Sequence, residues 1–383
     1  MWLIYFSAFL LLLYASLIVY YRVGWISMPE FVPEQRPLTT YQTTVSVIVP
    51  ARNETVNIAN CIRSLLAQNY PSSLLEIIVI DDHSTDDTAD IAQALALAYT
   101  NVHLIKLNEA DASMAYKKRG IEAGIAKATG TLIVTTDADC TYNKFWIETL
   151  VQYQEKTQAQ FIAAPVSYIT KNKFLSVFQC LDFMTMQGIT GASVYKRFHT
   201  MCNGANLAYT KAAFIEVNGF VGIDDIPTGD DMLLMYKIYK QHPDQVVYLK
   251  SKEAIVSTHP AFSWSAFFHQ RIRWASKASH YNDKRIFAAL LLVYVFNVWF
   301  LVMAIAAFFS WKYLLLLVAI VVAKTIVELW FLKPVASFFE MSKWLSWFPF
   351  LQPFHIVYVI ISGWLGKFGK YEWKGREIRQ QKF

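Results

Sequence analysis

Acidic side chains follow several runs of β-branched residues in this chain, at the point where each run ends. Glu54 comes after the run that includes Pro50, Asp82 comes after the next run, and Asp137 and Asp139 come after a later one. In an open α/β sheet, ligands bind beyond the carboxyl ends of the strands. We therefore expect these acids to line one crevice, where they would hydrogen-bond a base and ribose and hold a metal for phosphates.

Asp137 and Asp139 form the candidate metal site. Residues i and i+2 of an extended segment point to the same side, and two carboxylates on one side suit a hard cation such as Mg²⁺ or Mn²⁺ that also binds phosphates. Such a cation stabilises the charge on a departing diphosphate. A lone D-x-D triplet is common on loops, but its place directly after a buried strand favours metal binding.

The turn after Pro50 excludes two common nucleotide-binding motifs. It reads PARNE and contains no glycine, whereas a dinucleotide fold requires G-x-G-x-x-G there, so that the backbone can approach the pyrophosphate. The chain has no GxxxxGK[ST] P-loop either. The sequence therefore argues against a dehydrogenase or a P-loop enzyme.

Two downstream motifs each allow two interpretations. Asp230 and Asp231 precede a helix-like run, where they either stabilise the helix dipole by a few tenths to about 1 kcal/mol or supply a general base for an acceptor hydroxyl. Gln270, Arg273 and Trp274 directly precede an apolar region. They form either an interfacial anchor or a clamp in which arginine donates to a diphosphate and tryptophan stacks on a sugar.

Short β-branched runs alternate with helix-like stretches across the middle of the chain. The runs, which are typical of strands buried on both faces, are 45–50, 76–80, 102–105 and 131–135. The helix-like stretches are 54–68, 86–98 and 114–127. This alternation predicts a parallel α/β sheet.

The composition predicts membrane spans. Apolar residues make up 55% of the 383 residues and charged residues only 17%, which is too apolar for a soluble protein of this size. The net charge of +6 is not gathered on one element, which argues against a nucleic-acid partner. The four cysteines include no C-x-x-C pair, so we expect reduced thiols rather than a zinc site or disulfides.

The apolar segments lie at both ends of the chain. Trp2 to Tyr21 is uncharged and Arg22 follows it, which favours a retained anchor with its N-terminus outside over a cleaved signal peptide. Further apolar runs occupy 286–310, 313–323 and 345–366. Lys324 and Glu328 follow the second of these, four residues apart, so we expect them to pair on one helix face.

Two topologies fit these runs. An anchor plus three full spans would put the basic tail outside, against the positive-inside rule. An anchor plus two full spans and an interfacial or re-entrant segment, bent at Pro349 and Pro353, would put the tail inside, and we favour this arrangement.

Five motifs together resemble those of the family 2 glycosyltransferases, in particular the membrane-bound branch with cellulose, hyaluronan and poly-N-acetylglucosamine synthases. They are VSVIVPARNE, IIVIDDHSTDDT, TDADC, TGDD and QRIRW, in the family's order between Val45 and Trp274. The resemblance implies an α/β GT-A fold, an inverting displacement and a UDP-sugar donor. Together with the apolar and basic runs described above, it predicts a transmembrane anchor at 1–22, a cytoplasmic catalytic domain at 40–280, transmembrane or interfacial helices at 285–366 and a basic tail at 367–383.

The resemblance also assigns roles by position. Residues implied to bind the nucleotide-sugar are Pro50, Glu54, Asp82, Lys117 and Asp137, and those implied to bind Mg²⁺ or Mn²⁺ are Asp139 and Asp137. Asp230 aligns with the base and Asp231 is its neighbour. Residues implied to contact acceptor or diphosphate are Asn203, Gln270, Arg273 and Trp274. The family often has Gly-Lys where this chain reads YKK, and Lys117 stands at the position of that lysine.

Few apolar segments are available to enclose a polymer channel, so the sequence favours transfer of one or a few sugars to a membrane lipid acceptor. The Q-x-x-R-W motif is often tied to processivity and favours the alternative, a polysaccharide synthase with a saccharide acceptor that works with a partner or as an oligomer. In either case we expect an integral protein of the inner or plasma membrane with a cytoplasmic catalytic domain.

Overall fold

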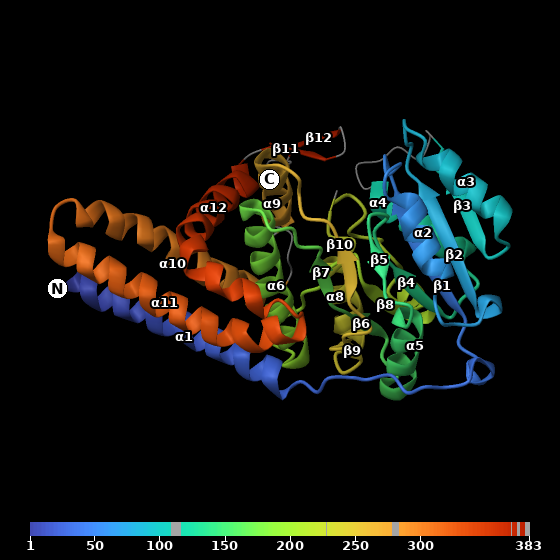
Figure 1. Ribbon diagram of the computed structural model, residues 1–383, viewed down its shortest axis with the longest axis horizontal. Coiled ribbons are helices and arrows are strands. Elements are labelled where there is room, and N and C mark those ends of the chain that lie inside the picture. Colours follow the sequence, from blue (N-terminus) through green and yellow to red (C-terminus); the bar gives the residue numbers. More distant parts are fainter. Residues whose placement is uncertain (109–115, 227, 278–282, 369, 374–375, 380–383) are drawn as a thin grey trace. The chain divides into compact units, whose positions relative to one another are not determined.

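The structure is a computed structural model that describes residues 1–108, 116–226, 228–277, 283–368, 370–373 and 376–379. The chain forms two compact units, which we describe separately (Figure 1). The sheet unit comprises Pro29–Tyr168 and Thr200–His259, and the helical unit comprises Met1–Met28, Ile169–His199 and Pro260–Phe383.

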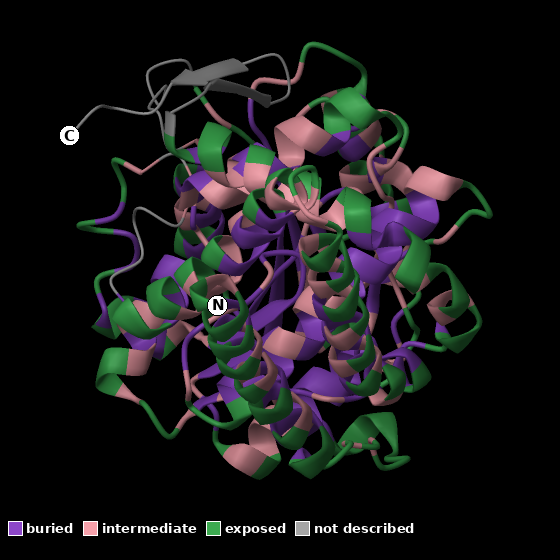
Figure 2. Cartoon of the chain, turned by 90° about the vertical axis from the view of Figure 1, so that its left-hand side faces the viewer, coloured by how far each residue is buried: buried purple, intermediate pink, exposed green. Residues whose placement is uncertain are grey.

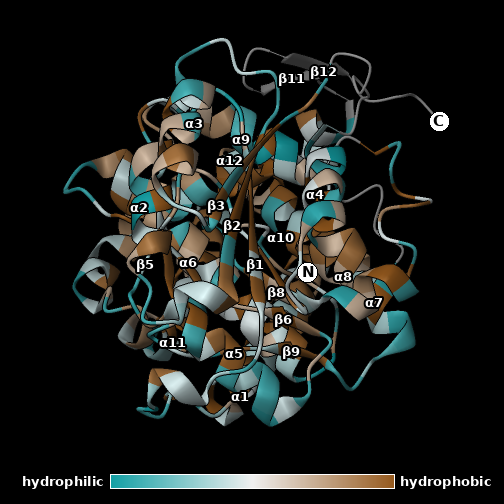
Figure 3. Ribbon diagram, turned by 90° about the vertical axis from the view of Figure 1, so that its right-hand side faces the viewer, coloured by the Kyte–Doolittle hydropathy of each residue, from teal (hydrophilic) through white to brown (hydrophobic). Residues whose placement is uncertain are grey.

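A seven-stranded sheet forms the core of the sheet unit, in the order β3-β2-β1-β4-β8-β6-β9. Its strands are β1 (Val45–Ala51), β2 (Leu75–Asp81), β3 (Val102–Lys106), β4 (Leu132–Thr135), β6 (Phe161–Ala163), β8 (Leu207–Thr210) and β9 (Val246–Tyr248). The four β-branched runs are therefore confirmed as strands. Figure 3 shows hydrophobic residues gathered along the central strands, as expected for strands covered on both faces.

The sheet is mixed rather than wholly parallel, so the prediction of a parallel sheet is wrong for its second half. Strands β1 to β4 are parallel, but β8 is antiparallel to both β4 and β6. A buried run of apolar residues does not reveal the direction of its strand, because both directions bury the same side chains. A second sheet contains β5 (Thr141–Tyr142), β10 (Val256–Thr258) and β7 (Val166–Tyr168).

Helices of the sheet unit connect these strands. They are α2 (Ile58–Leu66), α3 (Thr88–Ala98), α4 (Tyr116–Lys127), α5 (Trp146–Thr157), α7 (Lys211–Glu216) and α8 (Met232–Gln241). Helix α4 approaches the sheet closely at Gly124, where an added Cβ would lie 2.8 Å from Ile80 and 2.9 Å from Ile48. The three predicted helices are confirmed with shorter bounds, and residues 114–115 of the third prediction lie outside the described residues.

The helical unit contains four helices long and apolar enough to cross a membrane. They comprise α1 (Trp2–Ser27), α10 (Lys284–Ala307), α11 (Trp311–Phe338) and the segment Ser342–Lys367, which holds η5 (Ser342–Trp347) and most of α12 (Phe348–Phe368). Figure 2 shows exposed residues along the helices near the N-terminus, and many of them are large and apolar. Such surfaces suit contact with lipid.

Two further helices and a hairpin complete the described part of the helical unit. Helix α6 (Phe174–Tyr195) approaches α1 and α11 at glycines: a Cβ at Gly24 would lie 3.0 Å from Ala192 O, and one at Gly188 would lie 2.8 Å from Val335. Helix α9 (Trp264–Ser276) packs on α12. A hairpin of β11 (Lys370–Trp373) and β12 (Arg376–Arg379) follows, and Lys374 and Lys382 of the predicted basic tail lie outside the described residues.

Lys324 and Glu328 pair as predicted, with Nζ 2.8 Å from the Glu328 carboxylate. Lys324 Nζ also donates to Gln352 at 2.7 Å, and Tyr14 donates to Glu328. All four side chains are buried. This cluster ties α1, α11 and α12 together, as expected for charges that face protein rather than lipid.

His199 should make the helical unit sensitive to acid. Burial lowers its pKa from 6.5 to about 4, opposed by Asp283 and reinforced by Arg285. Between these pH values the unfolded chain binds a proton that the folded chain does not, so stability falls as the pH falls from about 6.5 towards 4. The loss should reach roughly 3 kcal/mol at the lower end.

The measurement is the apparent unfolding temperature in detergent between pH 7 and pH 4.5. The variant His199→Gln should flatten this profile, whereas His103→Gln, at an exposed position, should leave it unchanged. An unchanged acid sensitivity in His199→Gln would contradict the assignment.

Candidate active site

The first two strand ends of the sheet unit are held together by their own loops. Asp82 N donates to Ala51 O at 2.8 Å, and Arg52 Nη1 donates to the carbonyl oxygens of Asp82 and His83 at 2.6 and 2.9 Å. Asn53 and His83 adopt left-handed backbone conformations, with φ of 52° and 56°. The chain therefore turns sharply at both strand ends.

Glu54 and Asp82, two of the predicted nucleotide-binding residues, are both buried at this edge. The backbone N–H of Glu54 donates to Thr88 Oγ1 at 2.7 Å, and Asp82 Oδ1 lies 2.9 Å from His83 Nδ1. Pro50 lies in β1, opposite Ile80 of β2. The structure thus brings these three predicted residues to the carboxyl ends of adjacent strands.

The predicted metal-binding pair lies on the turn after β4. Thr136 N donates to Ile48 O at 3.2 Å, and Cys140 N donates to Asp137 O at 3.2 Å. Cys140 Sγ lies 3.6 Å from Asp139 Oδ1. The turn is therefore attached to β1 and closes on itself between Asp137 and Cys140.

Buried thiols lie behind this turn. Cys61 Sγ lies 3.8 Å from Asp137 O and 3.4 Å from Tyr142 OH. Burial raises the pKa of Cys61 to about 12 and that of Cys140 well above its ordinary value. Neither forms a disulfide, so both are neutral thiols that support the turn, in agreement with the prediction of reduced cysteines.

Lys117 joins the two acidic motifs. Its Nζ lies 2.8 Å from Asp137 Oδ1 and 3.0 Å from Asp230 Oδ2. Burial alone would lower its pKa, but the carboxylates of Asp137 and Asp230 raise it above the ordinary value, so the side chain stays charged. A single ammonium therefore bridges the turn after β4 and the acids before α8, which are far apart in sequence.

Asp230 and Asp231 have different surroundings. Asp231 Oδ1 accepts a hydrogen bond of 2.8 Å from Met232 N and is the N-cap of α8. Asp230 instead contacts Lys117, and its side chain is 12% exposed. The helix-capping interpretation thus applies to Asp231. The Asp230 carboxylate is the one that shares Lys117 with Asp137.

Gly204 lies against the same groups. A Cβ built there would lie 3.3 Å from Asp230 Oδ2 and 3.3 Å from Lys117 Nζ. The neighbouring Asn203 accepts a hydrogen bond of 2.9 Å from Ala205 N, which orders the loop. The sequence analysis assigned a role to Asn203 but none to Gly204, because close approach to groups far away in the chain leaves no local signal in the sequence.

The remaining predicted site residues belong to the helical unit. Gln270, Arg273 and Trp274 lie on α9 and are half-buried. Between them stands Arg271, which is buried, lies 2.9 Å from Asp182 of α6 and stacks 4.2 Å from the Trp274 ring centroid. The sequence analysis missed Arg271, because its partner is far away in the chain.

The family is shown by comparison with protein-family models. The model of glycosyl transferase family 2 matches residues 46–217, and that of glycosyl transferase family group 2 matches residues 132–362, more than half of the chain. The chain is a family 2 glycosyltransferase. The first of these matches contains Glu54, Asp82, Lys117 and the Asp137–Asp139 turn. The second contains the same turn and Asp230.

Two curated relatives support this assignment. The glycosyltransferase is 30% identical over 150 residues to glycosyltransferase AglE of Haloferax volcanii, covering 39% of this chain and 48% of AglE. It is 24% identical over 260 residues to the probable glycosyltransferase YdaM of Bacillus subtilis, covering 66% of this chain and 59% of YdaM. The chain thus spans about half of each relative's length.

A solved structure supports the fold. The glycosyltransferase aligns with the mannosyltransferase PcManGT from Pyrobaculum calidifontis, solved in complex with GDP-Man and Mn²⁺, with a TM-score of 0.60. The alignment covers 92% of this chain and 99% of that chain at 19% identity. The predicted GT-A fold is confirmed.

Replacing Gly204 should slow the glycosyltransferase by steric crowding. A valine at this position would press on Asp230 and Lys117. Misplacing a reacting group by about 1 Å can cost roughly 100-fold, so kcat/KM should fall roughly 10–100-fold. Gly204→Ala, whose Cβ contacts are tight but not clashing, should have a smaller effect. Steady-state kinetics of both variants check this. Normal kcat/KM for Gly204→Val, with an unchanged unfolding temperature, would contradict it.

The buried pair of Asp182 and Arg271 should be needed for stability. Asp182 also accepts a hydrogen bond of 2.5 Å from Tyr358 OH of α12, so it joins three helices. Asp182→Leu leaves a buried guanidinium without its counter-charge, which typically costs about 3–5 kcal/mol. The apparent unfolding temperature in detergent should fall sharply.

The double variant Asp182→Leu, Arg271→Met is the control for this prediction. Removing both charges should recover much of the lost stability, because the uncompensated charge is gone. If the single and double variants unfolded at the same lowered temperature, lost packing rather than a buried charge would be the cause.

Proposed function

We propose that this glycosyltransferase inverts the sugar configuration and moves one or a few sugars from a UDP-sugar to a lipid acceptor at the cytoplasmic face of a membrane. The observation that carries the proposal is the contact of Lys117 with both Asp137 and Asp230, at 2.8 and 3.0 Å. A single displacement needs the donor diphosphate and the base that activates the acceptor to lie close together. The shared contact with Lys117 places Asp137, the proposed donor-binding carboxylate, near Asp230, the proposed base. The apolar helices support the membrane setting.

In the proposed reaction, Asp230 removes the proton of an acceptor hydroxyl. The hydroxyl oxygen forms a bond to the anomeric carbon of the donor, and the bond from that carbon to the diphosphate oxygen breaks. The electron pair leaves with the nucleoside diphosphate, and the proton stays on Asp230. A positioned general base of this kind contributes typically about 10²–10⁴-fold.

The other residues bind and orient the donor. Glu54 and Asp82, buried at the ends of β1 and β2, would hydrogen-bond the nucleoside, and Lys117 would exchange a carboxylate for a donor phosphate. Gln270, Arg273 and Trp274 would close over the diphosphate and acceptor. These assignments follow the family's motifs.

The carboxylates of Asp137 and Asp139 suit a metal ion that binds together with the phosphates of the donor. Among the described residues, no three His, Cys, Asp or Glu side chains converge as a metal cluster. Mg²⁺ in phosphate sites is usually held by one or two carboxylates plus substrate phosphates, and Asp139 with Asp137 offers that donor set. A bound cation would neutralise charge on the departing diphosphate.

The alternative is a polysaccharide synthase that acts with a partner or as an oligomer, and the QRIRW motif favours it. The test is a panel of UDP- and GDP-sugars given to purified protein in lipid vesicles, with mass spectrometry of the product. A glycolipid with one or a few sugars from a UDP donor supports the proposal. A long polymer would support the alternative, and turnover of a GDP-sugar alone would replace the proposed donor.

A further inference from the structure

An apolar groove of about 240 Å³ lies on the helical unit between α6, α9 and α12. It is lined mainly by Phe178 of α6, Trp264 and Phe268 of α9, and Pro353, Phe354 and Val357 of α12. An apolar cavity of about 150 Å³ is enough to take up benzene. The groove therefore has room for a segment of hydrocarbon chain.

The walls of this groove are exposed. Trp264 is 42% exposed, Phe354 47% and Val357 53%. The last two lie within the candidate membrane span Ser342–Lys367. Large apolar side chains gathered around a hollow in such a segment suit a hydrocarbon occupant, since water would find no polar partner there.

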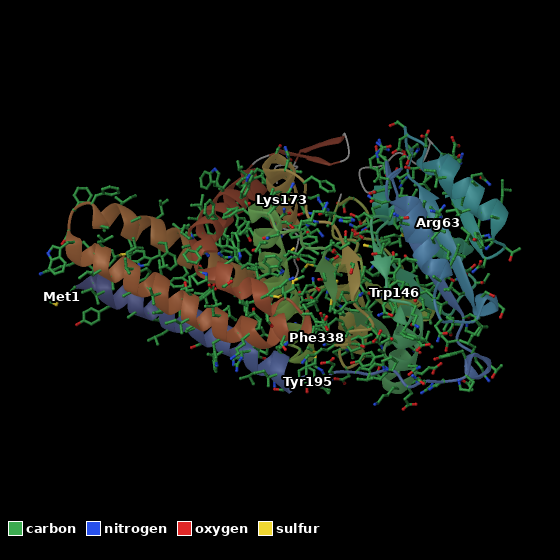
Figure 4. The ribbon with its side chains drawn as sticks, in the orientation of Figure 1. Met1, Arg63, Trp146, Lys173, Tyr195 and Phe338 are labelled. Atoms are coloured by element: carbon green, nitrogen blue, oxygen red, sulfur yellow. The ribbon has the colours of Figure 1, made fainter. Side chains whose placement is uncertain are left out.

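Basic residues directly precede the helix that contributes Phe178 to the groove. Lys173 directly precedes Phe174, whose ring centroid lies 5.0 Å from that of Phe354 and 6.1 Å from that of Trp264. Lys171 and Lys173 are both exposed, and Lys173 stands at the beginning of α6 (Figure 4). Exposed lysines beside an apolar surface attract anionic lipid headgroups.

The groove has a fixed floor. Tyr358 also lines it, and the Tyr358 hydroxyl donates to Asp182, the partner of Arg271. Tyr358 further packs against Phe178 and Phe267, with ring centroids 5.6 and 5.4 Å apart. A groove whose floor is held by a buried ion pair and edge-to-face ring contacts is formed before its ligand arrives, as binding sites usually are.

We propose that this groove binds the hydrocarbon chain of the anionic lipid that serves as acceptor, an inference that rests on the proposed function. The chain lies against Phe354, Val357 and Trp264, and the negatively charged head lies towards Lys171 and Lys173. The occupant that we propose is a long-chain lipid phosphate, because the apolar wall suits its chain and the exposed lysines suit its phosphate. An acceptor site must also prefer this lipid to the bulk phospholipid around it.

The test places a photoreactive p-benzoylphenylalanine at position 357. The matched control carries it at position 322, a valine of α11 that is 50% exposed on another candidate span. Both full-length proteins are reconstituted in phosphatidylcholine vesicles with tritiated undecaprenyl phosphate, undecaprenol or phosphatidylglycerol. Position 357 should label with undecaprenyl phosphate well above position 322, and less with undecaprenol. Phosphatidylglycerol should label the two positions alike.

The outcomes separate the claims. Equal labelling by undecaprenyl phosphate at the two positions would contradict the groove as the binding site of this lipid. Enrichment of phosphatidylglycerol at position 357 would contradict it too. Equal labelling by the alcohol and the phosphate would overturn the role of the lysines. Strong labelling in a protein that turns over no nucleotide-sugar would overturn the proposed function instead, and with it the identification of the lipid as acceptor.

A kinetic measurement adds a second readout. Val357→Trp fills the groove and should raise the KM for the lipid acceptor roughly tenfold or more, with the KM for the donor unchanged. Val322→Trp should change neither value. An unchanged acceptor KM in Val357→Trp would overturn the proposal.

Discussion

Replacing Asp230 by asparagine should lower kcat by roughly 10²–10⁴-fold, the usual effect of losing a general base. Asparagine has the same shape and cannot accept the proton. The carboxylate stands 3.0 Å from Lys117, and Asp231 is committed to capping α8. Asp230 rather than Asp231 is therefore the residue that we expect to act as the base. Single-turnover measurements at saturating donor would isolate the chemical step.

The control for this variant is Asp224→Asn. Asp224 is exposed on the loop that leads to the same motif, where it accepts a hydrogen bond of 3.0 Å from Gly222 N, and its replacement should leave kcat within about twofold, as surface changes usually do. Donor affinity of Asp230→Asn, measured by calorimetry, should stay close to that of the wild type. A variant with near-normal kcat would remove Asp230 from the mechanism.

The strands that position these acids were predictable from sequence because their side chains are buried on both faces. Residues 45–50 and 76–80 are mostly β-branched, and Val47, Ile48 and Val49 are wholly buried. The register that aligns Ala51 with Asp81 follows once both strands end at the same edge. Local composition alone thus located Glu54, Asp82, Asp137 and Asp139 at strand ends.

Partners that meet only in three dimensions could not be predicted. Lys118 resembles any helical lysine in the sequence, yet it is buried and donates to the carbonyl oxygens of Ile223 and Ile226. It thereby holds the loop before Asp230. Helix α6 was missed for a related reason: it is apolar on most sides, so it carries no helical periodicity that a sequence pattern can detect.

Removing divalent cations should abolish turnover, and Mg²⁺ or Mn²⁺ should restore it. Asp137 is already in contact with Lys117 at 2.8 Å, so its negative charge is partly balanced. Asp139, two residues later on the same turn, is the carboxylate that we expect to ligate the cation, with the donor phosphates supplying further oxygens. The check is activity after EDTA treatment, followed by titration with each metal.

Asp139→Asn tests the same assignment on a single side chain. Loss of an outer partner of a metal ligand already costs about 10–100-fold in metal affinity, so loss of the ligand itself should raise the Mn²⁺ concentration for half-maximal activity by at least that factor. Asp90→Asn, at an exposed position of α3, should leave the titration unchanged. In the proposed site the cation shares the donor's phosphates, so its apparent affinity should also rise with donor concentration.

Full activity in EDTA would mean that protein groups alone neutralise the departing diphosphate. Lys117 is the cation best placed for that task, because it already bridges the two acidic motifs at 2.8 and 3.0 Å. Lys117→Met would then abolish turnover while Asp139→Asn would not. If a metal is required, both variants should be impaired, and only the Asp139 variant should be partly rescued by excess Mn²⁺. The pattern of rescue across these two variants therefore decides which positive charge stabilises the leaving group.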